Sequence, residues 1–507
     1  MRVTNSMISN SARTHISNAK NSVLKYADQY TTGTKIQRPS DDPSVAVRSL
    51  KLRNTYSQIT QYAEKNIRDA INWMDTTQSA LDNIASKLSD MKYFLNQGAN
   101  DYLEADDRAS ALSALQQYVK SIFQEESNSD YAGRYVFTGY RTDTSLLFPT
   151  STDNLTYQIT ENLEYTDFDH VTVVTGGAEF AAGKDGQDYV DEAATTTKIY
   201  KMHLAYDNLS GTEVFPDEDD KGNAVAGASK ANIRITLNPA VDDFTGITTR
   251  KSTDADAYDV SDTSVVYLYD TGEILFGDKI YQGIQENKSQ ITVDYVKTEF
   301  NKFDIRPEMY FKCIAQNTVS GKITNYADPD GQEIRYEVNY SQTLNVNTQA
   351  KDAISTDIYR VMDYIAQTVS DADRIEKKIS DVDKMISGET DDAKLADLKS
   401  LKETLEMEKE LRGSVMTEAF GMGLTMVDKA LEKLNIASAE LGAKYKRAEL
   451  TESKLMDEQT NTEDKLSNNE DVDIADAIIN LSQADQLYQA SLSATAKILG
   501  NSLLNYI

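Results

Sequence analysis

The stretch that decides the fold is residues 43–97, which read PSVAVRSLKLRNTYSQITQYAEKNIRDAINWMDTTQSALDNIASKLSDMKYFLNQ. Its apolar side chains recur at alternating steps of three and four residues. That spacing places them on one side of an α-helix, and over several heptads it is typical of a helix that lies along other helices. Asp42 can cap this helix, Pro43 suits its first turn and Gly98 ends it. At 1.5 Å per residue the helix would be roughly 80 Å long, so it needs long partners.

The repeat has one irregularity. Two steps of four residues follow each other from Asn66 through Ala70 to Met74. Such a pair of steps breaks the strict seven-residue repeat and relaxes a supercoil. We therefore expect any supercoil to relax locally at this point.

Partners for the long helix are predicted further along the chain. An antiparallel helix is expected at about residues 105–130, and amphipathic faces return from about residue 352 to about residue 455. Gly388, with acidic residues around it, predicts the tip of a helical hairpin, and the polar residues 461–473 predict a break. No proline lies between residues 44 and 148 or after Pro329, so extended helices are permitted in both tracts.

Both ends of the chain carry an apolar stripe at helical spacing. The N-terminal stripe is rich in Asn, Ser and Thr, so its helix would be marginal alone in water. We expect the two stripes to bury one another or to be covered by copies in neighbouring subunits. The candidate assembly residues on these stripes are Ile8, Ala12, Ile16, Val23, Tyr30, Ile474, Ile478, Leu481, Tyr488, Leu492, Leu499 and Leu503.

The middle of the chain changes to β-type sequence at Tyr131. Up to about Val346, short β-branched and aromatic runs alternate with Gly, Asp, Asn and Pro turns. The segment 176–197 is small and polar, and we expect a mobile loop there. The clearest predicted strands are residues 170–174, 233–237, 265–269 paired with 273–276 across Asp270-Thr271-Gly272, 291–296 and 334–338.

These observations predict an α+β chain in which a long α-helical coiled-coil rod, formed from the N- and C-terminal segments, carries an inserted mainly-β domain. The predicted domains are 1–38 plus 471–507 for a terminal coiled-coil domain, 39–138 plus 350–470 for a helical rod domain with an extra helical hairpin at about 370–412, and 139–349 for the inserted variable β domain.

The composition opposes several kinds of binding partner and does not predict a membrane span or a cleavable signal. With 81 acidic against 52 basic residues, the net charge of −29 opposes binding to nucleic acid or an anionic membrane. No run of about 18 apolar residues predicts a membrane span, and the N-terminus does not resemble a cleavable secretory signal. Cys313 is the single cysteine, and its apolar neighbours favour a buried structural thiol over a reactive one.

A search for catalytic or ligand-binding signatures finds none, so no catalytic residue, cofactor or metal ligand is assigned. His15, His170 and His203 lack helical metal-ligand spacing, which favours surface or packing roles. Residues 217–222 begin like a calcium loop but fail at the later ligand positions, so a solvated turn is the better interpretation. Residues 421–423 lie in a helical pattern and lack the third glycine of a dinucleotide loop.

Taken together, motifs at the two ends resemble the flagellin-like axial proteins, and within that family the hook-filament junction group. At the front these motifs are Met1-Arg2-Val3-Thr4, Gly33, Arg38-Pro39-Ser40-Asp41-Asp42-Pro43, Gln61-Tyr62 and Asn66, followed by Gly133, Tyr135, Phe137 and Gly139. At the back they are residues 471–478, Leu481-Ser482, Tyr488-Gln489-Ala490 and residues 503–507. The chain departs from the family at Lys446-Arg447, where an Asn-Arg pair is usual, and in the extra helices of residues 370–412.

The resemblance implies a structural adaptor of the bacterial flagellum that is not an enzyme. Proteins of this group form a ring of identical subunits at the junction, between hook-associated protein 1 on the hook side and flagellin on the filament side. The resemblance further implies extracellular localisation after type III export without a cleaved signal peptide, with an export chaperone on the C-terminal helices.

Two alternatives stay open at the level of sequence. One is flagellin itself, although flagellin-like chains more often carry an Ala-Asp-Asp-Ala type of run where Ser40 to Pro43 stand, and end differently. The other is a surface enzyme or glycan-binding protein that acts through the β domain. An activity retained by an isolated fragment of residues 139–346 would favour the latter.

Overall fold

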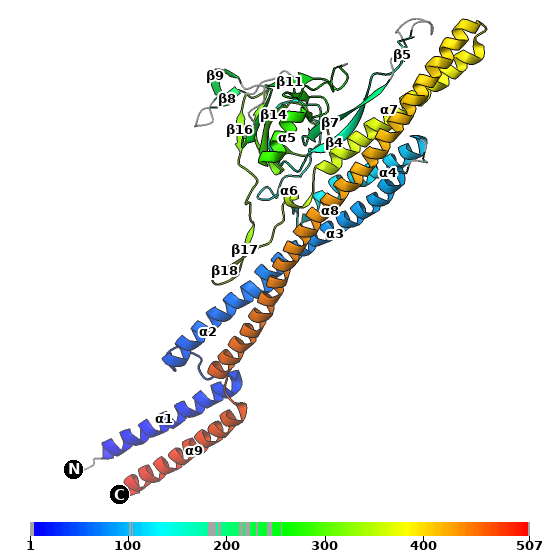
Figure 1. Cartoon of the computed structure of the whole chain (residues 1–507). Helices are drawn as coiled ribbons and strands as arrows, with labels where there is room; N and C mark the ends of the chain where they lie inside the picture. Colours follow the sequence, from blue (N-terminus) through cyan, green and yellow to red (C-terminus); the bar gives the residue numbers. More distant parts are fainter. Residues whose placement is uncertain are drawn as a thin grey trace. The chain divides into compact units, whose positions relative to one another are not determined.

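The computed structural model describes residues 5–100, 103, 105–180, 189–190, 194–211, 216–218, 224–229, 232–240, 246–254 and 256–504. Its helical elements are α1 (Asn5–Thr32), α2 (Pro43–Gln61), a π-helical turn (Tyr62–Asn66), α3 (Ile67–Gly98), α4 (Ala105–Gln124), α5 (Asp278–Asn287), α6 (Ala350–Ala353), α7 (Asp357–Gly388), α8 (Asp392–Glu470) and α9 (Ile474–Leu504). Figure 1 shows these elements coloured by their order along the chain. They divide into two compact units. Unit 1 comprises Met1–Ile71, Tyr336–Leu344 and Lys446–Ile507, and unit 2 comprises Asn72–Arg335 and Asn345–Tyr445. The predicted three-domain division stays a prediction.

The start of α2 follows from two residues that the sequence singles out. Asp42 has extended backbone angles, and its carboxylate accepts hydrogen bonds from the amides of Ser44 and Val45. Pro43 occupies the first turn, where its missing N–H costs nothing. The predicted cap is therefore confirmed.

The long helix contains a π-helical turn just before the predicted break in its repeat, and the relaxed supercoil stays a prediction. The turn covers Tyr62–Asn66 and separates α2 from α3 without interrupting the helical backbone. The Asn66 side chain donates to the carbonyl oxygen of Glu337, in the hairpin of β17 (Arg335–Asn339) and β18 (Gln342–Asn345), at 2.8 Å. Tyr336, in the same hairpin, donates from its hydroxyl to Asp69 at 2.6 Å. π-helical turns are frequent at positions where a helix has a role besides packing. Here the turn lies beside the contacts that the long helix makes with the hairpin of β17 and β18.

In unit 2 the apolar faces of α3, α4, α7 and α8 make a helical core. Buried residues at three-and-four spacing include Leu81, Leu88 and Leu95 on α3, Leu115 and Ile122 on α4, Ile358 and Ile365 on α7, and Phe420, Val427 and Leu434 on α8. Each loses most of its contact with water, which for a large aliphatic side chain is worth about 2 kcal/mol. The helical prediction for these segments is confirmed, as is the hairpin tip at Gly388.

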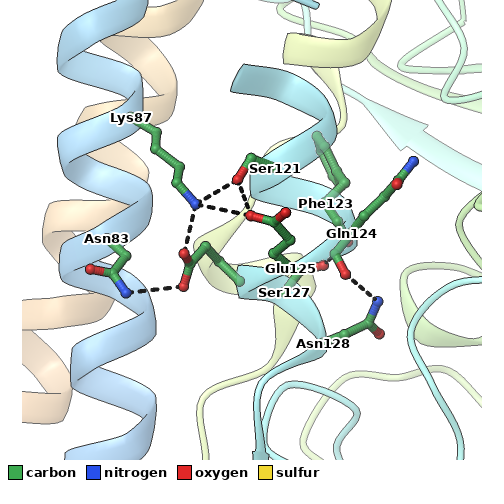
Figure 2. A network of polar contacts seen from close by, with 9 residues as sticks. Asn83, Lys87, Ser121, Phe123, Gln124, Glu125, Ser127 and Asn128 are labelled. Carbon is green, nitrogen blue, oxygen red and sulfur yellow. Dashed lines mark hydrogen bonds and ion pairs between the residues drawn. The ribbon is translucent and has the colours of Figure 1, made fainter. Parts of the chain in front are cut away.

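A polar network fastens the end of α4 to α3 (Figure 2). Lys87 on α3 donates from Nζ to the hydroxyl of Ser121 at 2.7 Å and to Glu126 at 2.6 Å. Asn83, one turn earlier, donates to the other oxygen of Glu126 at 3.1 Å. Helix α4 ends at Gln124, earlier than the predicted residue 130, and a short 3₁₀ turn (Glu126–Asn128) presents Glu126 to this network.

Strands β3 to β16 and helix α5 of unit 2 form what we call the β module, which is built on two five-stranded sheets. Their orders are β10-β14-β3-β15-β16 and β11-β12-β13-β7-β4, with β11 parallel to β12 and the other pairs antiparallel. The described strands are β1 (Asp130–Tyr131), β2 (Arg134–Tyr135), β3 (Leu155–Leu163), β4 (Asp169–Thr175), β5 (Glu179–Phe180), β6 (Tyr189–Val190), β7 (Thr195–His203), β8 (Pro216–Glu218), β9 (Ala224–Ser229), β10 (Ile233–Asn238), β11 (Ile247–Arg250), β12 (Val265–Leu268), β13 (Glu273–Phe276), β14 (Gln290–Lys297), β15 (Lys312–Asn317) and β16 (Ile323–Tyr326). All the strands named from the sequence are present, so the α+β prediction is confirmed.

A buried ion pair lies where the β module meets α7. Lys201 on β7 and Glu273 on β13 are both almost fully buried, with Lys201 Nζ 2.7 Å from Glu273 Oε1. The same ammonium lies 3.7 Å from the ring centroid of Tyr364 on α7. Although burial opposes it, the charge of Lys201 lowers the pKa of Glu273. The ion pair therefore favours the carboxylate form of Glu273.

Three predictions need correction or lie outside the description. Residues 461–470, predicted as part of a polar break, are the last turns of α8, and the break is confined to Asp471–Asp473. The predicted loop 176–197 contains β5, β6 and the start of β7, while residues 181–188 and 191–193 lie outside the described residues. The calcium-like run 217–222 lies mostly outside them too.

Candidate assembly surface

Helices α1 and α9 lie side by side in unit 1 and run in opposite directions (Figure 1). The chain leaving α1 and the chain entering α9 are joined by backbone hydrogen bonds. Lys35 N donates to Glu470 O at 2.7 Å, and Val472 N donates to Gly33 O at 2.9 Å. Lys35 adds a hydrogen bond from Nζ to the carbonyl oxygen of Asn468 at 2.6 Å. The two connectors therefore fix the register in which the terminal helices meet.

The seam between the two helices is made of small residues. Ala12 on α1 and Ala477 and Ala484 on α9 are buried, which lets the two backbones approach closely. Ile8, Ile16, Val23, Leu481 and Tyr488 flank this seam and are half-buried. Six of the twelve predicted assembly residues thus lie in or beside the seam, and the pair buries part of both stripes against each other. Leu499 and Leu503 lie where the structure describes the backbone but not the side chains.

The remaining predicted residues lie away from the seam and are exposed. Tyr30 on α1 and Ile474, Ile478 and Leu492 on α9 keep between 41% and 57% of their side-chain surface in contact with water. At 100° per residue the three α9 positions lie within about 40° of one another around the helix axis. They therefore form one apolar edge beside the seam.

Sequence reasoning missed a second apolar edge on α9. Ile479 is 53% exposed and Leu487 is 64% exposed, and neither belongs to the three-and-four stripe. We call Ile474, Ile478, Ile479, Leu487 and Leu492 the outer α9 face. A helix with apolar residues on more than one side is usually covered on more than one side, and this signal was available in the sequence.

The motif Arg38-Pro39-Ser40-Asp41-Asp42-Pro43 has a structural role in the connector from α1 to α2. Asp41 accepts hydrogen bonds from the backbone amides of Arg38 (2.9 Å) and Gln37 (3.1 Å), and these bonds lower the pKa of its carboxyl group. The pKa of Asp42 is lowered by hydrogen bonds from the Ser44 hydroxyl and from the amides of the first turn of α2. Both carboxylates stay ionised and shape the turn, and a cavity of about 200 Å³ lies beside it, lined by Ile36, Pro39, Ala46 and Leu50 among others.

Several buried titratable groups of unit 2 line one cavity. A cavity of about 1000 Å³ in unit 2 is lined by Glu161, Asp169, His203 and Arg360 among others. Burial raises the pKa of Glu161 to about 7 and that of Asp169 to about 6, and it lowers the pKa of His203 to about 3. Glu161 accepts hydrogen bonds from Tyr295 OH (2.9 Å) and Ala205 N (3.1 Å).

The described residues offer no metal centre and no membrane-spanning helix. Among them, no three His, Cys, Asp or Glu side chains gather in a way that could hold a metal ion. None of the described helices is both long and apolar enough to cross a lipid bilayer. Cys313 is buried, as expected, and burial raises the pKa of its thiol.

Comparison with known proteins identifies both ends of the chain. Residues 3–142 match the bacterial flagellin N-terminal helical region, and residues 424–507 match the bacterial flagellin C-terminal helical region. These ranges contain α1, α2, α3, α4 and α9, and part of α8. The predicted resemblance to flagellin-like proteins is therefore confirmed at both termini.

Individual relatives are similar to parts of this chain. Flagellar hook-associated protein 3 of Escherichia coli K12 is 26% identical over 245 residues, which span 47% of this chain and 76% of the relative. Flagellin of Bacillus subtilis 168 is 23% identical over 216 residues, 39% of this chain and 70% of the relative. A crystal structure of flagellar hook associated protein-3 from Legionella pneumophila aligns with 82% of this chain and 97% of its own at 11% identity, with a TM-score of 0.29. The chain thus carries the N- and C-terminal helical regions of bacterial flagellin, and it is similar to flagellar hook-associated protein 3.

Proposed function

We propose that the chain is a non-catalytic structural adaptor that joins the flagellar hook to the filament. In this proposal a ring of identical copies contacts hook-associated protein 1 on the hook side and flagellin on the filament side. The single observation that carries the proposal is the pair of α1 and α9, which is closed on one side and leaves the outer α9 face exposed on the other.

The energetics of the pair support coverage by other subunits. Its seam is mainly alanine, so the apolar area buried inside one copy is small for helices of 28 and 31 residues. Five large apolar side chains stay exposed on more than one side of α9, and exposed apolar surface larger than scattered single residues marks sites of association. If neighbouring subunits covered these side chains, each copy would bury apolar area that the seam leaves exposed, and the assembly would be stabilised.

The proposal includes a route of delivery. We infer that the chain is exported unfolded by the flagellar type III system, without a cleaved signal peptide, and that an export chaperone binds its C-terminal region before export. A weakly packed terminal pair is compatible with such a route, because it opens at small cost. The first about 35 residues and α9 should then be cleaved by protease in the isolated chain and protected after assembly.

The direct test changes the outer α9 face without changing the seam. The triple variant Ile478→Gln, Ile479→Gln and Leu487→Gln should keep the helical content of the isolated protein, because these side chains are exposed. Cells carrying it should export the protein but fail to retain filaments. The matched control replaces two exposed polar residues of the same helix, Ser482→Ala and Gln486→Ala, and should support normal motility. Normal filaments on cells carrying the triple variant would overturn the proposal.

Deletion of residues 474–507 is the coarser form of this test. It should leave unit 2 folded, as judged by the fluorescence of Trp73, the single tryptophan, which is buried there. Assembly should be lost.

A labelling experiment separates the adaptor from flagellin itself. Antibody against the β module should mark one position at the base of each filament if the chain is a junction protein. Labelling along the whole filament would favour the filament-subunit alternative, which the similarity to flagellin keeps open.

A further inference from the structure

An arm of the β module reaches away from its sheet. Strand β4 pairs over its whole length with β7, from Asp169↔Lys201 to Thr175↔Thr195, and the chain continues past Thr175 into β5. Figure 1 shows β5 beside the outer part of α7 and α8. We call residues 176–180 the arm.

The arm ends in an apolar cluster that belongs to the helical hairpin. Ala178 is 2% exposed and packs with Val382 on α7 and with Leu398, Leu401 and Leu405 on α8, all of them buried. Ile379, Met385 and Ile386 pack around this cluster. The arm therefore closes the outer end of the core between α7 and α8.

Polar contacts hold the arm at the same place. Lys378 on α7 donates from Nζ to the carbonyl oxygen of Ala178 at 2.9 Å. Gly177 has φ +119°, and a Cβ atom there would lie 2.7 Å from Oε2 of Glu408 on α8. Glu408 is 1% exposed, and its other oxygen accepts from Arg412 Nε at 2.7 Å. Only a residue without a side chain fits between the arm and this buried carboxylate.

The arm is the second place where the β module is held by α7. The first is near the beginning of α7, where Tyr364 covers the buried Lys201–Glu273 pair. Lys378 lies fourteen residues further along the same helix, which at 1.5 Å per residue is about 21 Å. A second point of attachment about 21 Å from the first leaves the module only rotation about the line that joins the two points.

We propose that the arm binds to the extra helical hairpin, residues 370–412. This contact attaches the β module to α7 and α8 at a second point. The hairpin then fixes the orientation of the β module relative to α7 and α8. The proposal is independent of the hook-filament assignment, because it concerns only contacts inside unit 2.

Hydrogen exchange on the full-length protein tests this contact. In Gly177→Val the new side chain meets Glu408, so the arm should leave the cluster and amide exchange in residues 378–405 should accelerate at least tenfold. Exchange in α3 should stay unchanged, which separates release of the arm from unfolding of unit 2. The control is Gly321→Val, where φ is +66° and no atom lies within 4 Å of the added Cβ, so it places valine at another positive-φ position of the β module without the clash.

A distance measurement between two spin labels tests directly whether the β module changes its orientation relative to the helices of unit 2. Spin labels at two exposed positions of unit 2, Val319→Cys in the β module and Tyr93→Cys on α3, report on the module's orientation, and buried Cys313 is shielded from the label. The width of the distance distribution should at least double in Gly177→Val and stay unchanged in Gly321→Val. Unchanged exchange and unchanged width in Gly177→Val, or equal changes in both variants, would overturn the proposal.

Discussion

Arg53 on α2 and Glu470, the last residue of α8, form a two-pronged ion pair in unit 1. Arg53 Nε lies 2.8 Å from Glu470 Oε1, and Arg53 Nη2 lies 2.6 Å from Oε2. Beside them, Asn469 donates from Nδ2 to the hydroxyl of Ser49 at 2.7 Å. These contacts tie α2 to the end of α8 just before the chain turns into α9, so they support the register of the terminal pair.

Replacing Glu470 by Gln should destabilise unit 1 by about 0.5 kcal/mol at neutral pH, a small effect because Arg53 is largely exposed. The hydrogen bond from Arg53 lowers the pKa of Glu470 in the folded protein. Stabilisation from such a group is present above its unfolded pKa and is lost as the pH falls through the folded pKa. Thermal melts of the protein and variant should therefore differ at pH 7 and converge near pH 3. A difference of equal size at both values would contradict this account.

Gly98, at the end of α3, should not accept a side chain. A Cβ atom there would lie 2.2 Å from Cε1 of buried Phe420, so Gly98→Ala should cost about 1–3 kcal/mol through overpacking. Gly442 lies inside α8 with no atom within 4 Å of an added Cβ, so Gly442→Ala should stabilise by about 0.5–1 kcal/mol. Chemical unfolding followed by Trp73 fluorescence should resolve the opposite signs. Destabilisation by both variants would show that the Phe420 contact is not the cause.

Lys201→Met should destabilise the β module strongly. It leaves Glu273 buried without its cation, and breaking a buried ion pair in this way costs about 3–5 kcal/mol. The double variant Lys201→Met and Glu273→Leu removes both charges and should recover most of the loss. Scanning calorimetry of the β-module transition measures both. A double variant as unstable as the single one would mean that lost packing, not the unpaired charge, is responsible.

Glu161 should make the β module more stable in mild acid. Burial raises its pKa to about 7 in the folded protein, above the ordinary value. A raised carboxyl pKa costs stability above the folded pKa, and this cost is relieved as the pH falls toward the unfolded pKa. Between pH 8 and pH 5 the gain from this group should be about 2 kcal/mol. In Glu161→Gln, whose amide oxygen can still accept from Tyr295, the pH dependence over this interval should flatten. An unaltered slope would show that other groups, such as Asp169, carry it.

Local signals made much of the fold predictable. The cap at Asp42, the hairpin tip at Gly388 and the turn Asp270-Thr271-Gly272 each depend on residues within a few positions, so the sequence shows them directly. The polar end of α8 was predicted wrongly because its helical state depends on distant partners. Asn468, Asn469 and Glu470 are held there by Lys35, Ser49 and Arg53, more than 400 positions away in the chain.

The candidate assembly surface likewise combines features that the sequence predicts with features that it does not. The amino-acid sequence by itself determined that both termini form amphipathic helices around an inserted β module, because helical periodicity and turn chemistry are local properties. Only the tertiary structure decided which residues close the terminal pair and which remain outside it. Ala477 and Ala484 form the seam since small side chains let two helices approach closely, and that choice turns Ile474, Ile478 and Leu492 toward solvent.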